Sequence, residues 1–316
     1  MALVIDTLRK RFGEVQALDG VSFTAEPGQV FGFLGPNGAG KTTTMRIVLD
    51  ILRPDSGTVT WAGRPVRESS RRAWGYLPEE RGLYPRMKVL DQLVFFASLY
   101  GVPRPRARRE ALHWLARFRA PEYADRRAEE LSKGNQQKIQ FIATILHDPD
   151  VLLMDEPFSG LDPVNVSLLK DAFLEMRDRG KTLVFSTHQM ETVEELCDAI
   201  AIIDKGRLVV AGQTRDVKRA GGKRVVRLGV GGDPELAWLP GLDGYRIVRS
   251  GLDYTEIEVE PTSEPEAILR EALTRGEYVT RFEITDRSIE DIFIELVGPV
   301  AADEKKLAAA PVTGVA

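Results

Sequence analysis

The sequence holds a single cysteine, Cys197, among its 316 residues. One cysteine excludes an internal disulfide and fits a reducing compartment such as the cytosol. The chain has no window of about 18 uninterrupted apolar residues, so we expect no membrane-spanning helix. Its first residues do not combine a basic segment with a long apolar run, so we expect no secretory signal. If the protein works at a membrane, another chain must supply the crossing.

The chain also lacks a strong excess of either charge. Its formal net charge is −4, with 43% hydrophobic and 28% charged residues. These values are typical of a globular protein, and the length suggests roughly two domains with a sizeable core. A basic run at Arg104, Arg106, Arg108 and Arg109 has no aromatic residues between its members. That pattern favours a solvated helix face, and we predict no direct nucleic-acid partner.

The chain is organised around one short stretch, residues 35–43. Residues 30–34 before it predict a buried strand and residues 43–49 after it predict a helix. The stretch therefore fits the phosphate-loop motif G-x-x-x-x-G-K-S/T in its strand–loop–helix context, where glycines turn backbone N–H groups toward an anion. Lys41 would contact the β- and γ-phosphates, and the Thr42 hydroxyl would ligate Mg²⁺. The predicted nucleotide-binding residues of this loop are Gly35, Pro36, Asn37, Gly38, Ala39, Gly40, Lys41, Thr42 and Thr43.

Three more polar residues follow predicted core strands. Asp155 and Glu156 end a continuous apolar run, and His188 follows the next predicted core strand. A carboxylate at the carboxyl end of a strand beside a phosphate loop is well placed to hold Mg²⁺, and this assigns Asp155 to the metal. Glu156 could polarise the attacking water, and His188 could donate a hydrogen bond to the γ-phosphate. The predicted catalytic residues are therefore Glu156, His188 and Lys41.

The order of the predicted elements indicates an α/β fold. Strands and helices alternate, which implies a mostly parallel sheet with helices packed on it. Antiparallel strands precede this pattern in residues 2–34. We divide the chain into a nucleotide-binding domain at 1–218, with a helical subdomain at about 83–135, a small α+β accessory domain at 219–298 and a flexible tail at 299–316.

Several ordered segments resemble the motifs of ATP-binding cassette (ABC) ATPases. Leu131–Gln137 precedes the strand that ends in Asp155 and resembles the signature segment of that family, usually written LSGGQ. The resemblance covers residues 3–212, about two-thirds of the chain. The other matching segments are the D-loop at 158–162, the switch region at 186–188, the Q-loop at 75–79 and the adenine-stacking position at 11–13.

A second resemblance lies near the end of the chain. Residues 288–293 resemble the extra C-terminal domain of ATPase subunits that serve ABC-2-type exporters, including sodium and drug efflux types. Together the two resemblances imply a P-loop NTPase fold of the ABC cassette type. Its mixed sheet would carry an antiparallel β-subdomain and a helical insertion, and a small α+β domain would follow.

The resemblance implies that ATP is held between two such subunits. The phosphate loop of one subunit binds the phosphates, and the signature segment of the other reaches the γ-phosphate with its helix N-terminus. Asp162 of the D-loop would couple the two sites, and Phe12 would stack on adenine. The second cassette is either another copy of this chain or a different protein. The implied signature residues are Ser132, Lys133, Gly134 and Asn135.

The chain departs from the family pattern in two places. Glu79 stands where the Q-loop has a glutamine, and a carboxylate can still ligate the metal. Lys133 and Asn135 replace the second glycine and the glutamine of LSGGQ. Ser132 and the backbone N–H of Gly134 would still supply the anion contacts. The predicted Mg²⁺ ligands are Thr42, Asp155 and Glu79.

The resemblance therefore implies an ATPase subunit, with ATP and Mg²⁺ as cofactors, that powers a separate membrane permease. Export of ions, drugs or other small molecules is the expected direction, from the cytoplasmic face of the membrane. Two alternatives remain open: a soluble ABC ATPase that acts on ribosomes or nucleic acid, and a nucleotide-gated regulatory module. The single phosphate loop and its short distance from the signature segment disfavour the first. The presence of Asp155, Glu156 and His188 disfavours the second.

Overall fold

The computed structural model describes residues 1–298 except residues 70, 81 and 232–235. The chain divides into two compact units, of which the first is Met1–Gln213 and the second begins at Thr214. The division falls slightly before the position that the sequence suggested, because the short helix α7, Thr214–Arg219, belongs to the second unit. The tail predicted at residues 299–316 lies outside the described residues.

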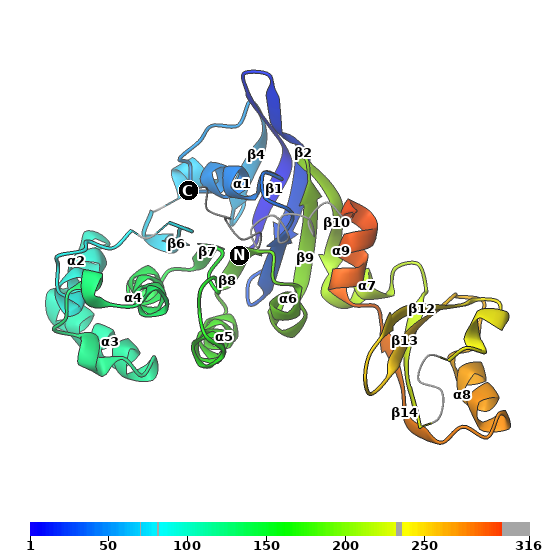
Figure 1. Ribbon diagram of the computed structural model, residues 1–316. Coiled ribbons are helices and arrows are strands. Elements are labelled where there is room, and N and C mark those ends of the chain that lie inside the picture. The colour runs from blue at the N-terminus through cyan, green and yellow to red at the C-terminus, as the bar shows by residue number, and fades with distance from the viewer. Residues whose placement is uncertain (70, 81, 232–235, 299–316) are drawn as a thin grey trace, which may run out of the picture. The chain divides into compact units, whose positions relative to one another are not determined.

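A six-stranded sheet forms the middle of the first unit (Figure 1). Its strand order is β10-β9-β3-β8-β7-β6, and all neighbours are parallel except the antiparallel pair β9 and β10. Every residue of β3, β7 and β8 is buried, as expected for strands covered on both faces. The strands are β3 Val30–Leu34, β6 Trp74–Leu77, β7 Val151–Asp155, β8 Thr182–Thr187, β9 Ala199–Asp204 and β10 Arg207–Gln213.

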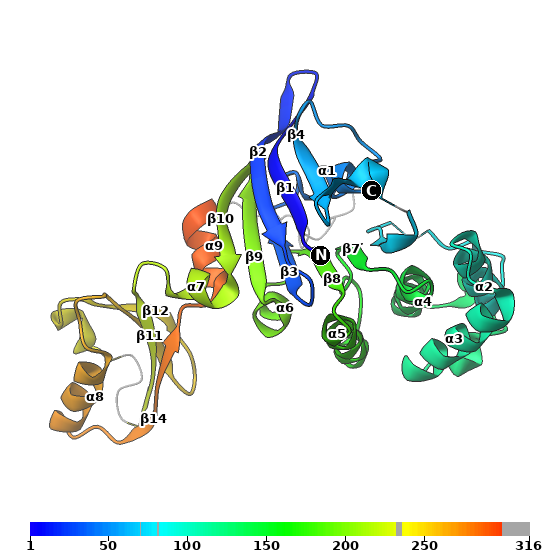
Figure 2. The same cartoon turned by 180° about the vertical axis from the view of Figure 1, so that it is seen from behind.

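An antiparallel sheet and a group of helices complete the first unit. The sheet has the order β2-β1-β4-β5. Figures 1 and 2 show α2 and α3 grouped beyond strand β6, with α4 between them and the six-stranded sheet. The strands are β1 Leu3–Phe12, β2 Val15–Ala25, β4 Ser56–Trp61 and β5 Arg64–Pro65. The helices are α1 Lys41–Val48, α2 Val89–Leu99, α3 Arg104–Arg117, α4 Lys133–Ile145, α5 Pro163–Asp178 and α6 Met190–Leu196.

A group of buried phenylalanines holds α4 and α5 against the sheet. The ring of Phe173 on α5 lies 5.8 Å from Phe141 on α4 and 5.6 Å from Phe185 on β8, measured between centroids. Phe158, from the loop after β7, lies 5.1 Å from Phe173. Such aromatic pairs stabilise beyond their buried area by about 0.5–1.5 kcal/mol each. The cluster therefore joins the helix that carries the signature segment to the strand ends that carry Asp155 and Ser186.

The second unit is a four-stranded antiparallel sheet with the order β12-β13-β11-β14. Its apolar core combines strand residues such as Val226 and Ile257 with Ile268 and Ala272 of α8. Ser288 caps α9 by accepting a hydrogen bond from the N–H of Asp291 at 3.0 Å, as the sequence pattern predicts. The elements are β11 Arg224–Val230, β12 Tyr245–Ser250, β13 Thr255–Val259, α8 Pro265–Thr274, β14 Val279–Asp286 and α9 Ile289–Val297.

The two sheets and the helical group match the predicted fold class. Among the described residues, no helix combines the length and the apolar character that a bilayer crossing requires.

Candidate functional site

The carboxyl ends of three parallel strands meet at one edge of the six-stranded sheet. Strand β3 pairs with β8, and β8 pairs with β7, so that Leu34 lies opposite Thr187 and Asp155 lies opposite Ser186. The phosphate loop follows β3, Glu156 follows β7 and His188 follows β8. The topology therefore brings together groups that lie more than a hundred residues apart in the sequence, as expected at the carboxyl edge of an α/β sheet.

The phosphate loop depends on glycine at Gly40. This residue has φ of +109°, and a Cβ atom there would lie 2.7 Å from the carbonyl oxygen of Ala17 and 2.7 Å from a methyl group of Leu18. A side chain would thus meet both a strained backbone and a steric clash. The loop therefore stays close to β2 and leads directly into α1.

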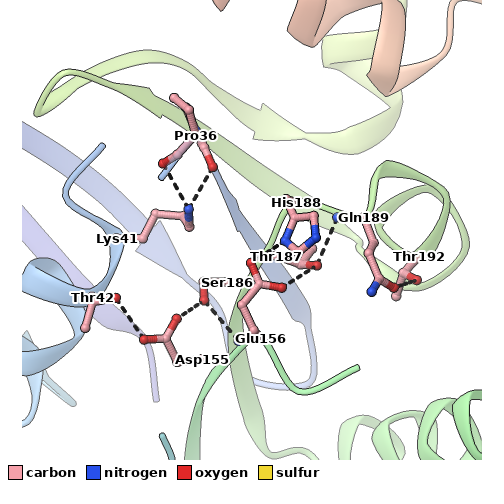
Figure 3. Close-up of polar contacts among 11 residues, drawn as sticks. Pro36, Lys41, Thr42, Asp155, Glu156, Ser186, Thr187, His188, Gln189 and Thr192 are labelled. Carbon is pink, nitrogen blue, oxygen red and sulfur yellow. Dashed lines mark hydrogen bonds and ion pairs between the residues drawn. The ribbon is translucent and has the colours of Figure 1, made fainter. Parts of the chain in front are cut away.

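Lys41 is buried at the first position of α1 (Figure 3). Its Nζ donates to the carbonyl oxygens of Gly35 at 2.7 Å and Pro36 at 3.1 Å. Burial lowers the pKa of Lys41, while the negative charges of Glu156, Asp155 and Glu79 act against that shift. The ammonium group is therefore surrounded by oxygen atoms and lies within the field of three carboxylates.

Asp155 is held by two hydroxyl groups. The Oγ1 of Thr42 donates to its Oδ2 at 2.9 Å, and the Oγ of Ser186 donates to its Oδ1. Asp155 is only 2% exposed. The sequence singled out Thr42 and Asp155 but gave no role to Ser186, which orients the carboxylate from the neighbouring strand.

Glu156 has a backbone conformation that is uncommon for a residue other than glycine, with φ of +48°. Its N–H donates to the carbonyl oxygen of Ser186 at 3.1 Å. Its carboxylate accepts from Thr187 Oγ1 at 3.3 Å and lies 2.8 Å from Nδ1 of His188 (Figure 3). A non-glycine residue with positive φ persists only where its surroundings hold it. Thr187 is a second site residue to which the sequence assigned no role.

A cavity of about 580 Å³ opens beside these groups. The predicted residues Glu79, Asp155 and Glu156 line it, together with the loop and helix residues from Asn37 to Thr43 other than Ala39. Four further lining residues were not predicted, because three begin strand β2 and one lies in the β9–β10 turn. These are Val15, Gln16, Ala17 and Lys205.

Four of the predicted nucleotide-binding residues do not line the cavity. Gly35 and Pro36 accept hydrogen bonds from Lys41, and Ala39 is buried at 3% exposure. Phe12 is 46% exposed, and Lys10 Nζ lies 5.5 Å from its ring centroid. Phe12 is therefore an exposed residue at the end of β1, outside the lining of the cavity.

The donor set fits a magnesium ion that keeps phosphate and water ligands. Within the described part of the chain, no group of three or more histidine, cysteine, aspartate or glutamate residues could hold a metal by itself. A hydroxyl group and a carboxylate, Thr42 and Asp155, lie in mutual contact at the cavity. Mg²⁺ commonly binds through one or two such groups plus substrate phosphates.

The predicted signature segment begins helix α4. Ser132 is the N-cap, and its Oγ accepts a hydrogen bond from the N–H of Asn135 at 3.3 Å. A Cβ atom at Gly134 would lie 3.4 Å from the carbonyl oxygen of Gly160 in the D-loop. The side chain of Asn135 donates to the hydroxyl of Tyr123 at 2.9 Å. Ser132 and its neighbour Lys133 are exposed, and neither lines the cavity of its own chain.

Asp162 has a local structural role. Its Oδ1 accepts hydrogen bonds from the N–H groups of Asn165 at 3.0 Å and Val164 at 3.1 Å, so that it caps α5. The bond from the backbone of Asn165 contributes most to lowering the pKa of this carboxyl group. The sequence predicted a coupling role for Asp162 and overlooked this helix-capping one.

The loop, the strand order and the carboxylates at the strand ends define the class of this protein, a P-loop nucleoside triphosphatase. Comparison with known proteins then identifies the family. The ABC transporter family model matches residues 18–159, and the model for the C-terminal domain of DrrA1-3-like ATP-binding proteins matches residues 212–297. The chain is 45% identical over 298 residues to the ABC transporter ATP-binding protein YhaQ of Bacillus subtilis, which covers 94% of this chain and 99% of YhaQ. The chain belongs to the ATP-binding proteins of ABC transporters.

Two further comparisons agree with this assignment. The Nod factor export ATP-binding protein I of Ralstonia nicotianae is 33% identical over 300 residues, covering 94% of each chain. A solved structure of an ATP-binding subunit of an ABC transporter has a TM-score of 0.65 and 28% identity, covering 69% of this chain and 92% of that chain. The predicted family, fold class and ATPase activity are confirmed, and the protein binds ATP.

Proposed function

We propose that this protein is the ATP-hydrolysing subunit of an exporter and that it drives a separate membrane permease. The observation that carries the proposal is the pair Glu156 and His188, which contact each other at 2.8 Å beside the phosphate-loop cavity. A general base must lie close to the proton that it removes and must be oriented there. The contacts of Thr187 and His188 with both carboxylate oxygens of Glu156 support the second condition, a fixed orientation.

In this proposal the predicted residues act on different parts of the nucleotide and on the attacking water. Backbone N–H groups of the phosphate loop bind the phosphates, Lys41 neutralises their charge, and Phe12 stacks on the adenine ring. Glu156 accepts a proton from the attacking water. His188 orients Glu156 and donates toward the γ-phosphate when nucleotide is bound.

Thr42, Asp155 and Glu79 would hold Mg²⁺. When bound, this ion neutralises charge that develops on the phosphate oxygens. The hydrogen bonds from Thr42 and Ser186 to Asp155 supply the orientation that a metal ligand needs. The chain itself therefore supplies the carboxylate of Asp155 in a fixed orientation beside the phosphate loop.

A second copy of the chain would complete the site. Ser132, Lys133, Gly134 and Asn135 begin a helix whose positive N-terminus is exposed, yet none of them lines the cavity of its own chain. That arrangement suits an anion carried by a partner. Asp162, which caps the next helix, would lie near the same interface.

Export is the direction favoured by the similarity to the Nod factor export protein. The permease would supply the membrane crossing, and this chain would bind to its cytoplasmic side. Ions, drugs or other small molecules would be the cargo, with selectivity residing in the permease. The second unit would stabilise the pair of cassettes or contact the permease.

The test is hydrolysis of Mg-ATP by the purified chain and by its Glu156→Gln variant. Loss of a general base lowers turnover by about 10²- to 10⁴-fold. We expect such a loss while the affinity for ATP is kept, because the loop and Lys41 are unchanged. Equal turnover in the two proteins would contradict the assignment of Glu156.

A further inference from the structure

Helix α4 carries polar side chains on the face that it buries. Gln137, Gln140 and Thr144 are 5%, 5% and 6% exposed. Their spacing of three and four residues places them on one side of the helix. A buried helix face is normally apolar, because a polar group costs free energy there unless it is hydrogen-bonded. The three side chains therefore need hydrogen-bond partners, and those of Gln137 and Gln140 lie beside the site.

Gln137 holds the chain immediately after Glu156. Its Nε2 donates to the carbonyl oxygen of Pro157 at 3.1 Å. Glu156 has φ of +48°, a conformation that its surroundings must maintain. The amide of Gln137 anchors the segment on one side of Glu156, and the pairing of β7 with β8 anchors it on the other.

Gln140 holds the chain on both sides of Glu79. Its Nε2 donates to the carbonyl oxygens of Pro78 at 3.1 Å and of Glu80 at 3.2 Å. Glu79 lines the phosphate-loop cavity, and its charge acts on Lys41. One side-chain amide thus fixes the turn that presents this carboxylate.

Thr144 completes the polar face but contacts no such segment. Its Oγ1 lies 3.3 Å from the carbonyl oxygen of Tyr76, inside strand β6, and 2.9 Å from that of Gln140. It anchors strand β6 at Tyr76 and bonds to none of the residues that flank Glu156 or Glu79. Of the three polar side chains, only Gln137 and Gln140 therefore bond to the residues that flank Glu156 and Glu79.

We infer that Gln137 and Gln140 are positioning residues that couple the signature segment to the two carboxylates of the same subunit. The inference rests on the proposed function, in which Ser132 meets the nucleotide of a second copy. Because α4 is a continuous helix from Lys133 to Ile145, a displacement at its first turn moves both glutamines with it. The hydrogen bonds then carry that displacement to the backbone around Glu156 and Glu79.

The test replaces each glutamine by methionine, which keeps length and volume but cannot donate a hydrogen bond. Loss of a neutral hydrogen bond at a positioning residue should lower kcat about five- to tenfold. The KM for ATP should stay within about twofold, because the loop contacts are intact. Thr144→Val is the matched control, since it removes a hydrogen bond from the same helix face and should leave kcat within about twofold of the unmodified protein.

A double-mutant cycle with Ser132→Ala tests the coupling itself. If α4 couples the contact made by Ser132 to the hydrogen bond of Gln137, adding Gln137→Met to Ser132→Ala should lower kcat by less than about twofold. The reason is that the Ser132→Ala variant has already lost the contact on which the coupling depends. The inference would be overturned if the fold-losses in kcat of Ser132→Ala and Gln137→Met simply multiplied in the double variant. It would also be overturned if the methionine variants had the same kcat as Thr144→Val. Leucine variants serve as replacements if a methionine variant does not fold. Hydrolysis by the unmodified chain and its loss in Glu156→Gln report separately on the proposed function.

Discussion

Nδ1 of His188 lies 2.8 Å from Oε1 of Glu156, while Thr187 Oγ1 donates to the other carboxylate oxygen at 3.3 Å. The sequence predicted that His188 acts on the γ-phosphate. The structure shows a contact of His188 with the proposed base, and we therefore propose that His188 also orients Glu156. Both partners follow core strands, which are rigid supports for such a pair.

Replacement of His188 by alanine should lower kcat for ATP hydrolysis by about 10²-fold, a magnitude typical of losing one positioned donor. ATP affinity should be retained, because Lys41 and the loop are unaffected. His113→Ala is the control, since His113 is exposed on α3. A steady-state assay of both variants is sufficient, and a His188→Ala protein as active as His113→Ala would refute the orienting role.

Replacement of Glu79 by glutamine should weaken the affinity for a divalent cation. The variant loses one negative charge at a cavity that also holds Asp155 and Glu156. We expect the Mn²⁺ concentration for half-maximal binding, with a non-hydrolysable ATP analogue present, to rise about tenfold. Electron paramagnetic resonance of free Mn²⁺ measures this directly. Glu80→Gln is the control, because its side chain does not line the cavity, and equal Mn²⁺ affinity of the two variants would remove Glu79 from the metal site.

The unfolding free energy of the second unit should depend on pH through the ionisation of Glu258. This side chain is 4% exposed and accepts hydrogen bonds from Arg246 at 2.8 Å and Lys223 at 3.1 Å. Burial alone would raise the pKa of Glu258, but these hydrogen bonds and the charges of their donors outweigh it and lower the pKa below its ordinary 4.5. The stabilisation by the ionised group is therefore complete above about pH 4.5 and is lost as the pH falls through the lowered value.

Glu258→Gln should accordingly destabilise this unit by about 1–3 kcal/mol at neutral pH. The difference in unfolding free energy between the two proteins should shrink as the pH falls below about 4.5. Calorimetry of the full chain as a function of pH measures that difference. A gap that stays constant from pH 7 to about pH 3 would show that ionisation of Glu258 has no such effect.

The sequence could predict two kinds of site residue: those in a contiguous motif, and those at the ends of neighbouring parallel strands. The phosphate loop is contiguous, and Gly40 and Lys41 are recognisable within it. Asp155 and Glu156 are predictable because parallel strands end at a common edge. Ser186 was visible only as part of a motif, since its bond to Asp155 spans two strands.

The remaining contacts depend on packing between distant segments, which periodicity does not reveal. Lys205 lines the cavity from a hairpin turn, and Asn135 turns its amide toward Tyr123. Gln137, which ends the segment that resembles the signature motif, and Gln140 had no assigned role until the acceptors at Pro157 and Pro78 were located. Their hydrogen bonds join residues 20 and 62 positions apart.

Sharing of the site between two copies can be measured as the mass of the Glu156→Gln variant in sedimentation equilibrium at saturating Mg-ATP. The variant should hold unhydrolysed nucleotide, so that Ser132 of each copy can meet the phosphates bound by the other. We predict a species of twice the chain mass that carries two nucleotides and returns to single chains when ADP replaces ATP. Single chains that each bind ATP fully, with no pairing at any attainable concentration, would contradict the claim that two copies share the site.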